Sequence, residues 1–126
     1  MTTDHDRVLM ELAKHFQPVL EKSPDGVYLW LDETHMVCNA QLARMFGYTL
    51  EEMNAHPPFL ATFVAEQDQE NFAWNYQNRV VPLAFPVTFR FTALSKDGST
   101  FRAETDMIPI SFDGHSVAYH FVRQVG

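Results

Sequence analysis

Side chains that could do chemistry are few in this sequence and lie far apart. The 126 residues include one cysteine, Cys38, and six histidines. Neither the spacing of a metal site nor that of a nucleophile beside a base is present. Cys38 has no second cysteine with which to form a disulfide, which indicates a reducing compartment. The sequence therefore predicts no metal ligands and no catalytic residues.

One acid–base arrangement is an alternative. Asp106, His115 and His120 could supply the Asp–His pair of a cone-shaped α+β isomerase or hydratase, a fold of similar length. Such folds place several long helices before most of their sheet, whereas here two short strands are expected directly after the first helix. We therefore expect a protein that is not an enzyme.

The composition is typical of one soluble domain. Hydrophobic residues make up 46% and aromatic residues 13%, enough apolar volume for a single core. A net charge of −7 opposes attraction to nucleic acid or to an anionic membrane surface. Charged residues interrupt the first twenty positions, so neither a signal peptide nor a membrane span is expected. We expect a cytoplasmic protein without nucleic acid or direct membrane contact.

The first part of the chain predicts a helix and a hairpin. Apolar residues at helical spacing indicate a helix over 3–16, with a capping box at Thr3 and a break caused by Pro18. Apolar runs at 27–31 and 36–38, separated by a polar turn, indicate two antiparallel strands.

Short helices and three further strands follow. Asn39 and Thr49 are typical helix caps, and Gly47 is a typical helix end, whereas the segment 55–64 is hard to assign. A longer helix is expected over 66–80. The apolar period changes to two from Phe85, and the turns at 96–99 and 112–115 separate strands at 101–110 and 117–125. The pattern predicts an α+β domain with one antiparallel sheet and helices over one of its faces.

Several short motifs, in the same order along the chain, resemble the PAS superfamily. They are the segments 23–28 (SPDGVY), 39–40 (NA), 46–53 (FGYTLEEM), 96–99 (KDGS) and 109–110 (PI). The resemblance covers roughly residues 16 to 125, and motifs in register are more specific than any one of them alone. It implies a five-stranded antiparallel sheet with short helices over one face and an N-terminal helix, residues 1–15, outside the core domain of residues 16–126.

The same resemblance implies a role in signalling. PAS domains receive a signal by binding a small ligand or a protein partner, dimerise, and pass the signal to an effector such as a histidine kinase of a two-component system or a cyclase. The alternative is an interaction and dimerisation module that binds no ligand. The fold alone does not identify a ligand.

Cofactors are restricted by the same resemblance. The flavin-binding light sensors of the superfamily carry a cysteine in an Asn-Cys-Arg motif, which this chain lacks, and Cys38 is better explained as a buried thiol at the end of the second strand. Haem-binding members supply a histidine from the helix expected here at 66–80, which has none, so only His56 and His120 stay as candidate haem ligands. Haem and non-covalent flavin stay open, and the cofactor is unknown.

Alternation along the last strand separates two sets of side chains. By resemblance, Ala118, His120 and Val122 face the pocket, and a ligand would contact the side chains that share this inner side. The expected lining residues are Leu29, Leu31, Cys38, Leu42, Phe46, Phe72, Tyr76, Phe89, Phe91 and His120.

The opposite parity leaves aromatic side chains on the outer face of the sheet. Four aromatic residues there would need a cover, and the amphipathic helix over 3–16 supplies one, from its own chain or from a second copy in a homodimer. The expected interface comprises Val8, Leu9, Leu12 and Phe16 of the helix and Tyr28, Trp30, Tyr119 and Phe121 of the sheet.

Overall fold

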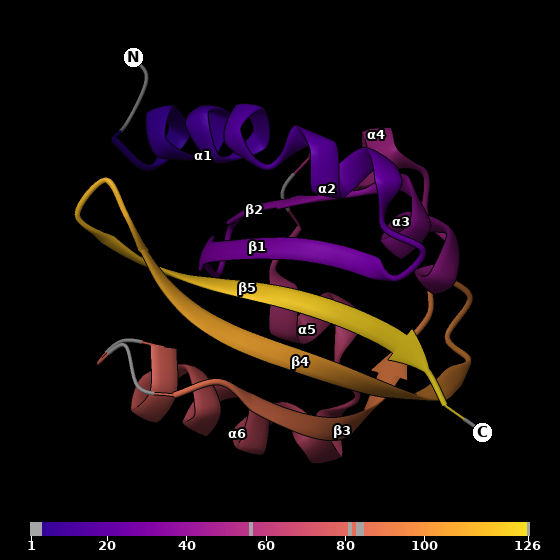
Figure 1. The fold of residues 1–126 in the computed structure, drawn as a ribbon. Helices are drawn as coiled ribbons and strands as arrows, with labels where there is room; N and C mark the ends of the chain where they lie inside the picture. Colours follow the sequence, from indigo (N-terminus) through magenta and orange to yellow (C-terminus); the bar gives the residue numbers. More distant parts are fainter. Residues whose placement is uncertain (1–3, 56, 81, 83–84, 126) are drawn as a thin grey trace.

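A five-stranded antiparallel sheet forms the centre of the computed structural model, which describes residues 4–55, 57–80, 82 and 85–125 (Figure 1). The order β2-β1-β5-β4-β3 places the last strand at the centre of the sheet, between β1 of the N-terminal hairpin and β4. The predicted sheet and α+β class are therefore confirmed. The strands are β1 (Gly26–Asp32), β2 (His35–Cys38), β3 (Val87–Leu94), β4 (Thr100–Phe112) and β5 (His115–Gln124).

The N-terminal segment forms two helices, α1 (Asp4–His15) and α2 (Gln17–Lys22). Phe16 separates them, and Pro18 lies in the first turn of α2, where its missing N–H costs no hydrogen bond. The expected break near Pro18 is thus confirmed. Thr3, the predicted cap of the first helix, lies outside the described residues.

Local capping sets the next two helices, α3 (Ala40–Phe46) and α4 (Leu50–Met53). The Asn39 carboxamide oxygen accepts the N–H of Leu42 at 2.9 Å, and it also accepts the N–H of Val27 at 3.0 Å, which ties the helix to β1. Gly47 ends α3 in the left-handed region, with φ of 82°. Thr49 and Glu52 form the predicted capping box of α4.

The segment between the capped helices and the meander contains α5 (Phe59–Phe63) and α6 (Glu66–Asn75), which continues into the π-helical turn η1 (Tyr76–Val80). The sequence predicts one helix over 66–80, and the structure keeps that span but widens its last turn. Phe72, Tyr76 and Val80 are buried as expected.

The meander follows the predicted turns, with small differences at the strand ends. β3 begins at Val87, and Phe85 before it is 67% exposed. β4 extends to Phe112, and the turn into β5 contains Asp113 and Gly114 with φ of 48° and 79°.

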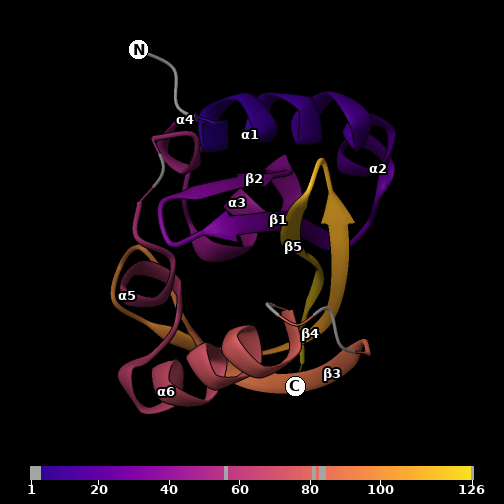
Figure 2. The same cartoon turned by 90° about the vertical axis from the view of Figure 1, so that its left-hand side faces the viewer.

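Two layers of helices enclose the sheet. α1 lies along one side of it, and α5 and α6 lie away from α1 on the other side (Figure 2). The buried side chains form two clusters accordingly, a larger one under α3 to η1 and a smaller one under α1. We call these sides the inner face and the outer face of the sheet. In the described part of the chain, no helix is long and apolar enough to cross a membrane.

Candidate functional site

The two faces of the sheet meet in β5, where neighbouring residues point in opposite directions. His120 is completely buried on the inner face, whereas Tyr119 packs against the cluster under α1. Ala118 and Val122 share the inner cluster. The predicted parity of the last strand is therefore confirmed.

The predicted parity of β1 is wrong. Tyr28 and Trp30 belong to the inner cluster, while Leu29 and Leu31 lie in the outer cluster under α1. The reason is that β1 is covered on both sides and reads as a continuous apolar run, so alternation does not show which residues face inward. The pairing register does show it, because Tyr28 lies directly opposite His120.

The other predicted lining residues lie on the inner face. Phe89 is partly exposed and packs against the cluster, while the others are buried. Their contact with a ligand stays a prediction. These residues are Cys38, Leu42, Phe46, Phe72, Tyr76, Phe89, Phe91 and His120.

Phe59 and Met107 are inner-face residues that the sequence reasoning missed. Phe59 stacks near Tyr28, with ring centroids 4.9 Å apart, and it comes from the segment after Pro57 and Pro58 that has no clear period. Met107 is fully buried and pairs with His120 across β4 and β5. Met107 lies on the same side of β4 as Ala103, because side chains alternate along a strand, and this alternation could have predicted that it faces inward.

Three polar side chains form a chain of hydrogen bonds at the centre of the inner face. The Nδ1 of His120 lies 3.2 Å from the Ala118 carbonyl oxygen, which can only accept, so Nδ1 carries the proton and Nε2 is free to accept. The Tyr76 hydroxyl, 3.4 Å from Nε2, therefore donates to His120. The Tyr28 hydroxyl, 3.2 Å from that of Tyr76, in turn donates to the Tyr76 hydroxyl oxygen. We call Tyr28, Tyr76 and His120 the inner relay.

Burial keeps the inner relay uncharged. Removal from water lowers the pKa of His120 to about 3 and raises the pKa of Tyr28 and of Tyr76 well above the usual value. The ring of Tyr28 stacks on that of His120 at 3.9 Å, and Trp30 stacks on Tyr76 at 4.2 Å. The site therefore offers stacked rings and neutral hydrogen-bonding groups.

Two buried polar atoms beside the relay have no hydrogen-bond partner within the described chain. They are Nε1 of Trp30 and Oγ1 of Thr105. Trp30 pairs with Ala118 and Thr105 pairs with Val122, so they flank the row of His120 on either side. Buried polar groups in native proteins nearly always have a hydrogen-bond partner, so two such atoms without one need an explanation.

The candidate cofactor residues differ in what they can offer. Burial raises the pKa of the Cys38 thiol to about 12, which keeps it protonated and unreactive. Nε2 of His120 already accepts from Tyr76, so a haem iron there would have to displace that hydroxyl. His56, the other candidate haem ligand, lies outside the described residues.

The structure does not bring together the acid–base residues of the isomerase or hydratase alternative. Asp106 points away from the inner relay and forms an ion pair with Arg123 at 2.9 Å. His115 lies at the β4–β5 turn, where its Nε2 is 2.9 Å from a carboxylate oxygen of Asp4. His120 is enclosed on the inner face.

The outer face is covered by α1 of the same chain. Val8 and Leu12 are completely buried against Leu29 and Val117. Phe16 extends the contact, its ring lying 4.9 Å from that of Tyr119, and Phe121 packs beside Tyr119. The predicted cover from the chain's own helix is confirmed, and the dimer version stays a prediction.

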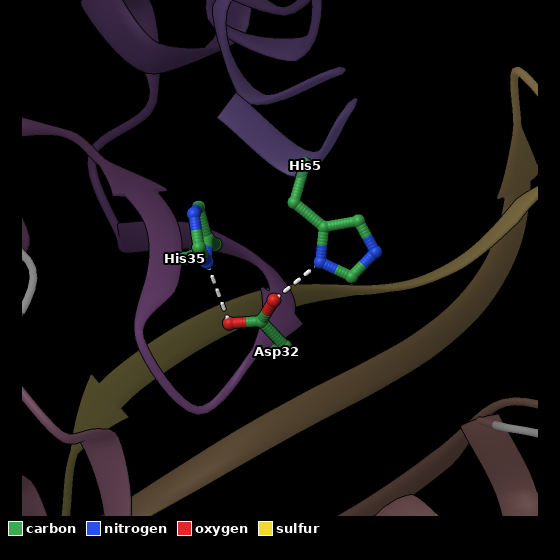
Figure 3. Close-up of side chains that lie close together, drawn as sticks. All are labelled: His5, Asp32 and His35. Carbon is green, nitrogen blue, oxygen red and sulfur yellow. Dashed lines mark hydrogen bonds and ion pairs between the residues drawn. The ribbon is translucent and has the colours of Figure 1, made fainter. Parts of the chain in front are cut away.

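A group of histidine and aspartate side chains lies where α1 meets the end of the sheet (Figure 3). Nδ1 of His35 is 2.8 Å from one carboxylate oxygen of Asp32, and Nδ1 of His5 contacts the other. One ligand atom from each of the three lies within 4.8 Å of the other two. Sequence spacing could not find this group, because His5 comes from α1 and the other two come from the β1–β2 hairpin.

The family model described as the PAS fold matches residues 14–123. No curated protein sequence matches the chain.

Solved structures share the fold at low sequence identity. The PAS domain of a two-component sensor histidine kinase is 19% identical with a TM-score of 0.69, and the match covers 92% of this chain and 99% of that one. The PAS domain of an HTR-like protein from Haloarcula marismortui is 17% identical, with a TM-score of 0.70 and coverage of 95% and 97%. The PAS domain of a LuxR-family transcriptional regulator from Burkholderia thailandensis, solved in complex with ethanol, is 14% identical, with a TM-score of 0.65 and coverage of 87% and 96%.

Proposed function

The chain belongs to the PAS-fold family of sensory domains, and we propose that it is a cytoplasmic sensor that binds a small, uncharged organic molecule on the inner face. The observation that carries this proposal is the pair of unpartnered buried atoms, Trp30 Nε1 and Thr105 Oγ1. A bound molecule that accepts a hydrogen bond would satisfy the indole N–H, which can only donate. Such a ligand would supply the polar partner that these atoms do not find within the described chain.

The chemistry of the inner face favours an uncharged ligand. The buried polar side chains of the described chain, such as Thr105 and His120, carry no charge, and the relay tyrosines stay protonated. A charged molecule would lose its hydration there without gaining an ion pair. Aromatic and aliphatic side chains line the rest of the inner face, as in ordinary small-molecule sites. The similar PAS domain solved with ethanol is an instance of this ligand class in the same fold.

We propose that the signal leaves through the sheet and α1. β5 carries the relay residue His120 on one face and Tyr119, beneath the N-terminal segment, on the other. Residues 1–15 would then act as a signalling helix on the sensory domain of residues 16–126. Since similar PAS domains come from histidine kinases, the effector we propose is a kinase, with a cyclase as the other candidate.

The inner-face proposal is tested with the two tryptophans of the chain. Native mass spectrometry of gently purified protein should show an added small mass, and Trp30→Phe should remove it or weaken its retention at least tenfold. Trp74→Phe is the matched control, because Trp74 is 53% exposed on α6. Absorption bands of haem or flavin would identify a coloured cofactor instead of a colourless ligand.

If purified protein carries no added mass, titration with benzyl alcohol followed by amide chemical shifts is the second measurement. Shifts confined to β1, β5 and η1, and lost in Trp30→Phe, support the proposal. The absence of both signals contradicts ligand binding and favours the interaction module without a ligand.

Homodimer formation is a separate part of the proposal. Met10 is 71% exposed on the side of α1 that faces away from the sheet, so it is available to a second copy. We expect light scattering after size exclusion to show a dimer that Met10→Glu dissociates. A monomer at all concentrations would contradict this part and leave the inner-face proposal standing.

A further inference from the structure

We propose that His5, Asp32 and His35 bind a divalent transition metal of the zinc class at the joint between α1 and the β1–β2 hairpin. Figure 3 shows both imidazole rings directed at the same carboxylate. Two imidazole nitrogens and a carboxylate oxygen are a common protein ligand set for zinc, and the fourth position would hold water. This site is separate from the inner face and does not depend on a ligand there.

The distances suit a metal after the three side chains rotate. One donor atom from each residue lies within 4.8 Å of the other two. Around tetrahedral zinc, with bonds of about 2.0–2.2 Å, two donor atoms lie about 3.3 Å apart. The His35–Asp32 pair, now at 2.8 Å, therefore has to open by a few tenths of an ångström, which rotation of side chains can supply.

The surroundings of the three residues already hold the ligands in orientation. Nε2 of His35 lies 2.8 Å from a carboxylate oxygen of Asp6, so that nitrogen donates its proton to Asp6. Nδ1 would bind the metal after losing the proton that it donates to Asp32. A second-layer hydrogen-bond acceptor of this kind accompanies most metal-binding histidines. Asp32 is held by the backbone N–H of Thr34, which donates to its Oδ1 at 2.9 Å.

Access and local charge also favour a cation. The side chains of His5, Asp32 and His35 are 39%, 33% and 20% exposed, so an ion can enter from solvent without unfolding. The guanidinium of Arg7, on the same helix as His5, is paired with Asp4 at 2.7 Å and with Asp113 at 2.8 Å, so carboxylates balance its charge.

The test is isothermal titration of the full chain, without a histidine tag and freed of metal by a chelator, with zinc chloride. We expect one ion per chain. His5→Ala, Asp32→Asn and His35→Ala should each weaken binding at least tenfold, and Asp6→Asn should weaken it about tenfold as an orienting residue. His15→Ala, in the last turn of the same helix, is the matched control and should bind as the wild type does.

Two further readouts keep the proposal falsifiable if a variant fails to fold. With cobalt in place of zinc, the protein should show the strong visible absorption of a tetrahedral site. When zinc binds, the nitrogen chemical shifts of the imidazoles should change at Nδ1 of His5 and of His35. No heat of binding, or undiminished binding in all three ligand variants, overturns the proposal. If His115→Ala loses zinc binding and His35→Ala binds zinc as the wild type does, the assigned ligands are wrong.

Discussion

The inner and outer faces of the sheet are both buried, yet they are built from different chemistry. The outer face packs the aliphatic side chains of Leu29 and Val117 under Leu12 of α1, and its aromatic rings, such as Tyr119, pack against the N-terminal segment as well. The inner face stacks aromatic rings around the hydrogen-bonded relay, and Trp30 Nε1 finds no hydrogen-bond partner there among the described residues. An aliphatic contact needs only shape, whereas unpartnered polar atoms specify what can lie against them. The comparison separates the face that holds the helix from the face on which we propose that a ligand binds.

Histidines on the two sides of the sheet differ in the same way. Burial lowers the pKa of His120 to about 3 on the inner face. At the edge of the outer face, partial burial alone would lower the pKa of His35, but hydrogen bonds to Asp32 and Asp6 outweigh it and raise that pKa above the usual value. The inner face therefore disfavours the charged form of a histidine, while the edge of the outer face favours it.

The largest effect is expected on the outer face. Leu12→Ala removes a completely buried side chain between α1 and the sheet, and we expect it to lower the free energy of unfolding by about 2–5 kcal/mol. Urea unfolding followed by circular dichroism measures it. Lys14→Ala, at an exposed position of the same helix, should change it by less than about 0.5 kcal/mol. Equal small losses in both would mean that α1 is not part of the folded unit.

A pH dependence of stability should come from the inner face. The unfolded chain protonates position 120 near pH 6.5, while the folded His120 stays neutral to about pH 3, so the unfolded state binds more protons between these values. Stability should therefore fall as pH is lowered through this window, by up to about 1.4 kcal/mol per pH unit.

Denaturation in the presence of a chelator at several pH values measures that slope. His120→Gln should flatten it, and His15→Gln on the exposed end of α1 is the control that should keep the wild-type slope. An unchanged slope in His120→Gln would mean that His120 is not the group excluded from protonation.

A smaller loss should follow when the relay is broken without removing its rings. Tyr76→Phe leaves the Tyr28 hydroxyl and Nε2 of His120 without their shared partner, which should cost about 1–3 kcal/mol of unfolding free energy. Tyr119→Phe, half-buried on the outer face, is the matched control and should cost less. Equal costs in the two variants would contradict the contrast between the faces.

The smallest change in unfolding free energy is expected at a buried inner-face hydroxyl for which the described chain supplies no hydrogen-bond partner. Thr105→Val keeps the shape of the side chain and removes a buried hydroxyl that has no partner within the described chain. Unfolding free energy should stay within about 1 kcal/mol of the wild type or rise slightly. A clear loss, measured by urea unfolding of ligand-free protein, would show that the hydroxyl is satisfied after all.

Local signals were sufficient for most of the fold. Caps such as Asn39 and Thr49 and the glycine turns act over a few residues, so their partners are visible in the sequence. The parity of β5 was predictable only through the resemblance to the PAS superfamily, because alternation separates two sets of side chains without showing which set faces inward. The π-helical turn that begins at Tyr76 was not predictable, since a π turn keeps the apolar spacing of a helix over so short a span.

The candidate sites depended on contacts that no local signal carries. β1 is apolar at every position from Val27 to Leu31, so only its pairing with β5 decides that Tyr28 and Trp30 face inward. His5 and Asp32 meet because α1 folds back over the end of the hairpin, 27 positions along the chain. Residues that converge through tertiary packing are invisible to spacing rules.

The central position of β5 also limits how its length can change during evolution. β1 and β4 pair with this strand on either side, and its successive residues alternate between two different interiors. Inserting or deleting one residue ahead of Tyr119 would turn every following side chain to the opposite face, placing His120 under α1 and Tyr119 in the relay. Homologous sequences should therefore accept length changes in the turn at Asp113 and Gly114 but not within β5.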